Sequence, residues 1–235
     1  MLTPTELYFV LEGHPQQRID ALPQYKANRQ VEPGTKKHEE MKQFYRQVDE
    51  IVDLLCTAFP VHVVRHPEFE CDDTIYNLIR DFDSKVEVVV ASNDSDFTQL
   101  LDEFENVRVY NPMLKTYVKK HDVPYVMWKA LRGDGSDNIP GIPGVGDITA
   151  TAALNDPDVL QEILTRVGAS ETYTRNVQLI RFISWSQFDT SKLLVNKCEH
   201  LDNNKLRSTF EKYGFNSLLK EAVWDKFVRT FTYTL

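Results

Sequence analysis

The chain has 235 residues, 42% of them hydrophobic and 26% charged, and its formal net charge is −8 at pH 7. This composition is typical of a globular protein, and no apolar run approaches the roughly 18 residues that a membrane span needs. The acidic balance argues against a protein that coats nucleic acid, yet it fits a nucleic-acid enzyme whose acids gather in a metal site. Cys56, Cys71 and Cys198 have no paired spacing, so we expect reduced thiols in a cytoplasmic protein.

In chain order, the first half of the sequence alternates short apolar runs with segments of helical periodicity. Buried strands are predicted at residues 6–13, 61–64, 86–92 and 107–110, and residues 114–118 are predicted to pair with the last of these as a hairpin. Helices are predicted at residues 35–59, 68–82, 97–101 and 124–131. Strands that alternate with helices predict an α/β fold, in the form of a three-layer domain with a mainly parallel sheet.

The second half of the sequence is different, because it is mostly helical in pattern after Asp156. Just before that point, residues 124–154 combine a helix, a glycine hairpin and a second helix that begins at Asp147. We therefore divide the chain into an α/β domain at residues 1–122 and a mostly helical region at residues 123–235.

Carboxylates follow the ends of the predicted strands, which is where ligands bind in an open α/β sheet. They are Glu12 after the first strand, Glu70, Asp72 and Asp73 after the second, Asp94 and Asp96 after the third, and Asp134 and Asp137 in a later loop. Like charges that converge need a counter-charge, and oxygen-rich clusters of this kind suit Mg²⁺ or Mn²⁺. Two such ions about 4 Å apart would clamp the attacking and leaving oxygens of a phosphodiester.

Each acidic motif also has an ordinary structural interpretation. Asp72 and Asp73 lie in the first turn of a predicted helix, where carboxylates favour the helix dipole. The run "NDSD" after a strand is typical of a turn, and "GDGSDN" is typical of a solvated loop. Their joint occurrence beside strand ends and helix starts favours the metal site. The chain has no His or Cys spacing that is typical of zinc and no GxSxG elbow.

Two further features suit the backbone of a nucleic acid. Gly141, Gly144 and Gly146 allow tight turns that bring backbone N–H groups close to an anion, and the helix after them points its N-terminus the same way. The alternative is an ordinary turn between two helices. The other feature is a basic segment in an acidic protein, which contains Arg18, Lys26, Arg29, Lys36 and Lys37.

Four motifs carry a resemblance to a known family: "LPQYKANR", "ECDD", "SNDSDFTQLL" and "GDGSDNIPGIPGVG". In their order and spacing the chain resembles the 5′-nuclease family, from about residue 9 to residue 219. This family comprises bacteriophage flap endonucleases and 5′–3′ exonucleases, and the 5′-nuclease domain of bacterial DNA polymerase I. The resemblance implies a PIN-like sheet, a basic helical arch at about residues 18–45 and a helix–hairpin–helix motif at about residues 124–154. For a phage-encoded member it implies the cytoplasm of a bacterial host.

The resemblance also implies roles for individual residues. Glu12, Glu70, Asp72 and Asp73 would serve one metal region, and Asp94, Asp96, Asp134 and Asp137 a second. Arg18, Lys26 and Arg29 match positions at the base of the arch, and Tyr25 matches a position that stacks on a base. Lys26, Arg29, Asp94 and Asp137 are the expected catalytic residues, with Lys36 and Lys37 as further DNA contacts. The glycine hairpin would hold duplex DNA through its amides and a bound K⁺.

Three features depart from the pattern of the family. The carboxylate after the first strand is Glu12, where most relatives have Asp, and the loop from it to Arg18 is slightly short. After "GVG" the chain has Asp147, Ile148 and Thr149 in place of a usual Lys, so the grip would depend more on backbone amides. Relatives also open with a further strand that bears a metal-binding Asp, so we expect an upstream segment or a separate peptide to complete the sheet.

These observations favour a metal-dependent, structure-specific 5′ nuclease that hydrolyses DNA with a 5′ flap or 5′ end by a two-metal mechanism, with replication proteins as further partners. The alternative is a catalytically weak or inactive relative that binds DNA junctions, because the first strand and its Asp are missing. A PIN-like ribonuclease is disfavoured, since such domains generally lack the glycine hairpin.

Overall fold

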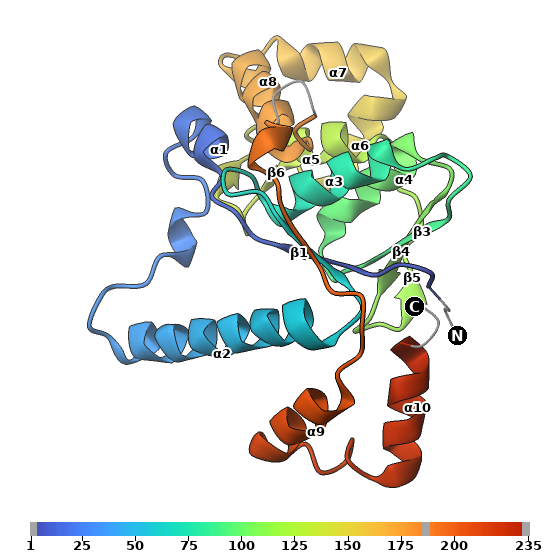
Figure 1. Ribbon diagram of the computed structural model, residues 1–235. Coiled ribbons are helices and arrows are strands. Elements are labelled where there is room, and N and C mark those ends of the chain that lie inside the picture. The colour runs from blue at the N-terminus through green and yellow to red at the C-terminus, as the bar shows by residue number, and fades with distance from the viewer. Residues whose placement is uncertain (1–3, 185–188, 232–235) are drawn as a thin grey trace. The chain divides into compact units, whose positions relative to one another are not determined.

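The computed structural model describes residues 4–184 and 189–231 (Figure 1). The chain forms two compact units, and each unit draws on separate stretches of the sequence. Unit 1 comprises Met1–Gly13, Val31–Cys71 and Asp189–Leu235, and unit 2 comprises His14–Gln30 and Asp72–Phe188. Within the described ranges, no helix is both long enough and apolar enough to cross a membrane.

Unit 1 contains a three-stranded sheet with the order β1–β2–β8. β1 (Tyr8–Leu11) and β2 (His62–Arg65) are parallel, and β8 (Leu194–Lys197) pairs with β2 in the antiparallel direction. The middle strand buries Val63 and Val64, whereas β8 is exposed along its whole length. The sequence does not predict β8, because an exposed edge strand needs neither an apolar run nor strict alternation.

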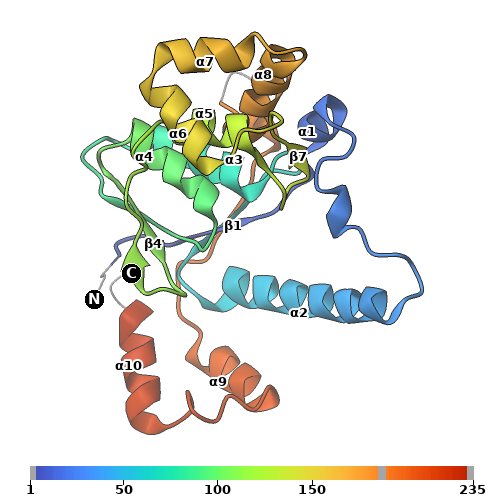
Figure 2. The same ribbon diagram turned by 180° about the vertical axis from the view of Figure 1, so that it is seen from behind.

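The helix α2 (Lys36–Ala58) is the long amphipathic helix that the sequence predicts at residues 35–59. It begins after Thr35, whose side-chain oxygen accepts a hydrogen bond from the backbone N–H of His38. Only its C-terminal end is buried, and α9 (Asn203–Lys212) and α10 (Glu221–Phe231) pack there (Figure 2). The core of unit 1 is therefore made mainly of Leu54, Leu55, Ala58, Phe59, Leu206, Phe210 and Trp224. A 3-10 turn, η4 (Thr190–Lys192), precedes β8.

Unit 2 contains a second three-stranded sheet with the order β3–β4–β5. β3 (Val88–Ala91) and β4 (Val107–Asn111) are parallel, and β5 (Thr116–Tyr117) turns back on β4 as the predicted hairpin. The prediction of one mainly parallel sheet is wrong for the described residues, which form two small mixed sheets and a two-stranded hairpin. The reason is that, among these residues, β1 pairs only with β2 and β3 only with β4, while antiparallel strands join the other edges.

Helices make up most of the rest of unit 2. They are α1 (Gln16–Ala21), α3 (Cys71–Asp81), α4 (Leu100–Glu103), α5 (Tyr125–Arg132), α6 (Asp147–Asn155), α7 (Pro157–Leu164) and α8 (Ala169–Ile180), with the 3-10 turns η1 (Ala27–Arg29) and η2 (Ser95–Gln99). The helix α5 packs against α6 and α8, and α6 packs against α7. Leu131, Ala150 and Ile163 lie in the core that these helices share.

Candidate metal centre

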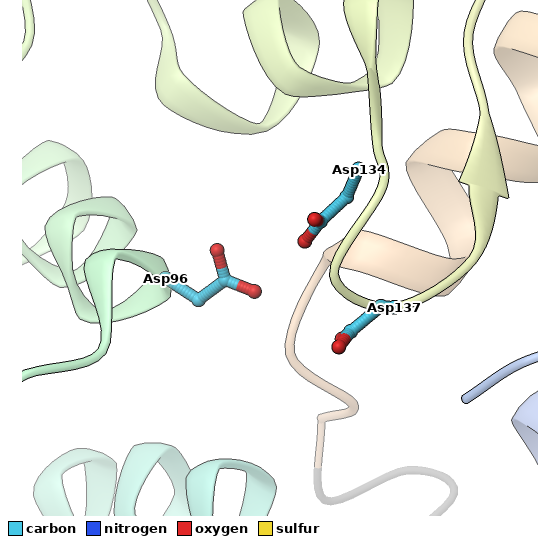
Figure 3. A group of neighbouring side chains, drawn as sticks. All are labelled: Asp96, Asp134 and Asp137. Carbon is cyan, nitrogen blue, oxygen red and sulfur yellow. The ribbon is translucent and has the colours of Figure 1, made fainter. Parts of the chain in front are cut away.

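Three aspartates of unit 2 form an acidic group, which we call the aspartate trio: Asp96, Asp134 and Asp137. One carboxylate oxygen of each lies within 4.8 Å of those of the other two. Figure 3 shows that Asp134 and Asp137 come from one loop and that Asp96 faces them from η2. The structure thus brings together three of the eight carboxylates that the sequence predicts to converge.

Local turns fix the positions of these carboxylates. The side chain of Asp94 accepts a hydrogen bond from the backbone N–H of Asp96 at 2.9 Å, which starts η2. In the other loop, which links the short strands β6 (Gly133–Asp134) and β7 (Ile139–Pro140), Ser136 donates its N–H and its hydroxyl to the carboxylate of Asp134. The ordinary interpretation of "NDSD" as a turn therefore holds for Asp94, whereas its neighbour Asp96 joins the trio.

A buried lysine lies between two members of the trio. The ammonium of Lys129 on α5 pairs with Asp96 and lies 2.6 Å from a carboxylate oxygen of Asp134. Burial is the largest single effect and by itself lowers the pKa of Lys129. The electrostatic interactions with Asp96 and Tyr125 and the hydrogen bonds to Asp134 and Asp96 together outweigh burial and raise the pKa. Burial by itself raises the pKa of Asp134, but hydrogen bonds from Lys129 and Ser136 outweigh burial and lower it to about 2. Both groups are therefore charged at neutral pH.

A tyrosine one helical turn before Lys129 supports the same carboxylate. The Tyr125 hydroxyl donates to Asp96 at 3.0 Å and lies 3.1 Å from the hydroxyl of Ser95. Burial and the charge of Asp96 raise the pKa of Tyr125 to about 12, so its proton stays in place to donate. Neither Tyr125 nor Lys129 is among the predicted site residues. The available signal was their i, i+4 spacing on a helix that leads directly into the loop of Asp134.

Residues of the basic segment contact Asp137, the third member of the trio. The guanidinium of Arg29 pairs with its carboxylate, the ammonium of Lys26 lies 3.7 Å away, and the Tyr25 hydroxyl lies 3.3 Å away. Burial raises the pKa of Asp137, and the two neighbouring aspartates add to that effect, although both cations oppose it. The structure thus places three of the predicted DNA contacts beside a predicted metal ligand.

Backbone hydrogen bonds hold the η1 turn against the loop of Asp137. The N–H of Lys26 donates to the backbone oxygen of Asp137 at 2.9 Å. The side-chain amide of Asn28 donates to the backbone oxygen of Ser136 at 3.3 Å, and that of Asn138 donates to Gln24 at 2.8 Å. Lys26 adopts the left-handed backbone conformation, with φ of 53°, which is uncommon for a residue other than glycine. The cations therefore keep their place through main-chain contacts as well as through charge.

Two predicted site residues, Arg18 and Asp73, form a buried ion pair with each other. Arg18 donates to both carboxylate oxygens of Asp73, at 2.5 and 2.8 Å, and both side chains are buried. Asp73 also accepts from the backbone N–H of Ile183 at 2.8 Å, and Arg18 donates to the backbone oxygen of Leu179 at 2.8 Å. The sequence assigned Asp73 to a metal and Arg18 to DNA, whereas in the structure they pair with each other inside unit 2.

The remaining predicted ligands lie outside the trio. Glu12 belongs to unit 1, where its carboxylate accepts from the backbone N–H of Cys71 at 3.1 Å, at the start of α3. Glu70 is buried in unit 1, and Asp72 lies in the first turn of α3. Among the described residues, the aspartate trio is the one group of three potential ligands that meets the distance criterion for a metal ion.

The glycines in and beside the predicted hairpin differ in how much space surrounds the position of a Cβ atom. A Cβ on Gly141 would lie 2.1 Å from the backbone oxygen of Arg132, and one on Gly133 would lie 2.3 Å from the nitrogen of Gly141. These two glycines therefore allow β6 and β7 to pack closely. Gly144 has φ of 78° in an open turn, and Gly146 also has open space around it. Gly144 and Gly146 are thus the positions at which the backbone remains accessible.

The last predicted DNA contacts lie on the surface. Lys36 and Lys37 are exposed at the start of α2, and Lys36 lies 3.5 Å from Glu40. Asp147, in the first turn of α6, pairs with Arg132 at 3.2 Å and is exposed. A carboxylate at this helix start opposes anion binding by the helix dipole, so any phosphate contact there depends on the amides of the preceding turn.

Known proteins share sequence with this chain. The sequence model of the family described as "5'-3' exonuclease, N-terminal resolvase-like domain" matches residues 2–129. A 5'-3' exonuclease of Mycobacterium tuberculosis is 32% identical over 186 residues, which are 69% of this chain and 57% of that protein. The thermostable DNA polymerase I of Thermus aquaticus is 28% identical over 229 residues, which are 88% of this chain and 26% of the polymerase. The chain thus spans little more than half the length of the first relative and a quarter of the second.

Solved structures with a similar fold come from bacteriophage T5. The T5 D15 protein co-crystallized with metal ions has a TM-score of 0.60 and 20% identity, and the match covers 74% of this chain and 75% of that one. A variant of the T5 D15 flap endonuclease, in a pseudo-enzyme-product complex with DNA and metal ions, has a TM-score of 0.56 and 22% identity, over 74% and 73% of the chains. At these identities the likeness shows an α/β fold similar to that of the T5 protein.

Proposed function

Because the chain belongs to the 5′-3′ exonuclease family, we propose that it is a metal-dependent, structure-specific 5′ nuclease that hydrolyses phosphodiesters of DNA. The observation that carries this proposal is the aspartate trio, with Lys26 and Arg29 held against it. Carboxylates that gather a divalent cation and basic side chains that contact a phosphate are the two parts that phosphodiester hydrolysis requires.

The trio fits a hard divalent cation. Its ligand atoms are all carboxylate oxygens, and neither a cysteine nor a histidine takes part, which suits Mg²⁺ or Mn²⁺ better than zinc. Asp134 and Asp137 are buried, and Asp96 is partly exposed, so solvent reaches at least one of the three carboxylates. A divalent ion bound there would supply Lewis-acid stabilisation of the phosphate.

The side chains around the trio would have different roles in the reaction. Lys129 and Tyr125 fix the orientation of Asp96 and Asp134, so the ligand oxygens need not reorganise. Lys26 and Arg29 would stabilise negative charge that develops on the phosphate. Tyr25 is only 6% exposed and packs in a core cluster of unit 2, so it would act through its hydroxyl beside Asp137 and not by stacking on a base. Asp94 would act through the position it gives Asp96. The open turn at Gly144 and Gly146 would hold duplex DNA through its amides, with K⁺ as a further ligand of that turn.

A second ion, as the two-metal mechanism requires, would need Glu12, Glu70, Asp72 and Asp73. The buried ion pair of Asp73 with Arg18 weighs against a full ligand set, because both Asp73 oxygens already have partners. That observation favours a second candidate function: a relative with weak or no turnover that binds DNA junctions.

Cleavage assays on two substrates distinguish these functions. The full chain is incubated with a 5′-flap DNA and with a matched RNA hairpin, each in Mg²⁺ and in EDTA. We expect cleavage of the flap DNA in Mg²⁺ alone. Full-rate cleavage in EDTA would overturn the metal-dependent mechanism, and flap binding without cleavage would establish the junction-binding alternative. Preference for the RNA hairpin would show a ribonuclease instead.

A further inference from the structure

Each carboxylate of the aspartate trio has a cationic partner from the chain itself. Asp96 and Asp134 share the ammonium of Lys129, while Asp137 is met by Lys26 and Arg29. Three carboxylates therefore face three cations. A divalent ion that binds to the trio must compete with at least some of these internal charges, because the carboxylates cannot satisfy both at full strength.

The internal cations differ in how firmly they are held. The Lys129 side chain is 4% exposed and bridges two carboxylates. The Arg29 side chain is 56% exposed and contacts the single carboxylate of Asp137, and Lys26 lies 3.7 Å from the same group. A charge that already faces water loses little when it leaves its partner, whereas a buried charge without a partner is costly. Arg29 is therefore the cation that can leave most readily. The Lys26 side chain is 22% exposed, but its separation of 3.7 Å makes its contact with Asp137 the weaker of the two.

We propose that Lys26 and Arg29 hold Asp137 in place of a divalent cation, and that metal binding at the trio releases both side chains towards the DNA phosphate. The inference rests on the proposed function, and it adds an order of events. With both side chains released, the trio and Lys129 keep a formal charge of −2, which one divalent ion neutralises. The basic residues become free for DNA only when the site is loaded, so metal binding and substrate contact are coupled.

The released side chains stay close to the site because the backbone of η1 does not depend on the charge contact. The N–H of Lys26 remains bonded to the backbone oxygen of Asp137, and Asn28 and Asn138 supply two more ties between the turn and the loop. A rotation about side-chain bonds is thus sufficient for Arg29 to exchange a carboxylate for a phosphate oxygen. No movement of the loop itself is required.

The test is Mn²⁺ binding to the full chain without DNA, measured by electron paramagnetic resonance of the free ion. Arg29→Gln removes the competing charge and should tighten Mn²⁺ binding by about two- to five-fold, the range of an exposed ion pair. Arg166→Gln is the matched control, because Arg166 is an exposed arginine of unit 2 that pairs with the single carboxylate of Glu162. It should bind Mn²⁺ as the unchanged chain does.

Asp137→Asn separates the inference from the proposed function. If the trio binds metal, Asp137→Asn weakens Mn²⁺ binding, and in that background Arg29→Gln has no further effect. Metal binding that depends on Asp137 but is unchanged or weakened by Arg29→Gln would overturn the exchange alone. Mn²⁺ binding that is absent, or insensitive to Asp137→Asn, would overturn the metal site and the exchange together.

A second measurement follows Arg29 directly. The side-chain Nε–H resonance of Arg29, assigned by its loss in Arg29→Gln, should shift when Mg²⁺ is added to the full chain. In Asp137→Asn the same resonance should begin near its shifted position and stay there. A resonance that does not respond to saturating Mg²⁺ would show that Arg29 remains on Asp137, which overturns the exchange.

Discussion

Asp73 and Asp137 are both acids that the sequence assigns to a metal, but their surroundings in unit 2 are opposite. Asp73 is fully buried and bonded through both oxygens to Arg18, with a third bond from the Ile183 N–H. Asp137 lies beside two other aspartates, and burial raises its pKa despite two nearby cations. The chain thus fills the hydrogen-bonding capacity of Asp73, whereas burial disfavours the charge of Asp137.

This difference distinguishes carboxylates that stabilise the fold from carboxylates that are available to bind a ligand. A carboxylate whose hydrogen-bonding capacity is filled by the chain contributes to folding, and its loss leaves a buried partner unpaired. A carboxylate crowded by like charges costs folding free energy, and the cost is relieved when a cation binds. The two classes respond to neutralisation with opposite signs, which makes the comparison testable.

The largest effect is expected for Asp73→Ala, which leaves the guanidinium of Arg18 buried without its partner. We expect the free energy of unfolding to fall by about 3–5 kcal/mol. Urea denaturation in EDTA measures this change, and Asp158→Ala, at an exposed position of α7, is the control.

Replacing both partners checks that the effect comes from the ion pair. The double variant Arg18→Met, Asp73→Leu removes both charges together, so it should recover part of the lost stability. If Asp73→Ala instead stabilised the protein in EDTA, Asp73 would belong with the crowded carboxylates of a metal site.

The next effect concerns Asp137→Asn, which keeps the shape of the side chain and removes a ligand charge. We expect cleavage of a 5′-flap DNA to fall by at least about 10²-fold, because oriented charge at the reacting phosphate is worth several kcal/mol. Flap binding should stay within a few-fold, since the other phosphate contacts remain. Stability in EDTA should be unchanged or higher, in contrast to Asp73→Ala. Parallel loss of binding, cleavage and stability would show that Asp137 is structural.

Lys26→Ala should lower the single-turnover rate of cleavage by about 10²-fold, because stabilising charge on the phosphate is worth about 3 kcal/mol. Arg29→Ala should have the same effect to a smaller extent, since its side chain is more exposed. Lys85→Ala, an exposed lysine of unit 2, is the control. A single-turnover rate that Lys26→Ala leaves unchanged would place Lys26 outside the reaction.

Much of the fold follows from periodicity in the sequence. The apolar spacing in residues 35–59 predicts α2, although only its C-terminal end is buried, and the β-branched run before Asp94 predicts β3, of which only Val90 is buried. The arrangement of the strands does not follow. Register and neighbours depend on long-range pairing, so neither the contribution of β8 nor the division into two sheets is visible in local pattern.

For the candidate site, the sequence identifies the residue types but not their partners. The placement of the acids in the predicted topology favours the convergence of Asp96, Asp134 and Asp137, but it predicts the same for five further carboxylates that lie outside the trio. It does not reveal that Arg18 pairs with Asp73, since those residues are 55 positions apart. The sequence does not predict Lys129 as a site residue for a related reason. A lysine on an amphipathic helix is usually solvated, and only the folded chain shows that Lys129 is buried between two carboxylates.

The smallest effect tests whether Lys129 neutralises part of the trio without any metal. The pKa of Asp134 is lowered from 3.8 to about 2, so its ionised form stabilises the folded state. That contribution is fully present above the unfolded value and is lost as the pH falls through the folded value. In EDTA, Asp134→Asn should therefore lower the free energy of unfolding by about 1–2 kcal/mol at pH 6. The difference from the unchanged chain should shrink as the pH falls from about 4 to 2, because Asp134 then progressively takes up a proton and loses its charge. Urea denaturation at a series of pH values measures the difference. A difference that stays constant down to pH 2, or that favours Asp134→Asn at pH 6, would mean that Lys129 does not compensate the charge of Asp134 and that the whole trio, like Asp137, is a cost to folding.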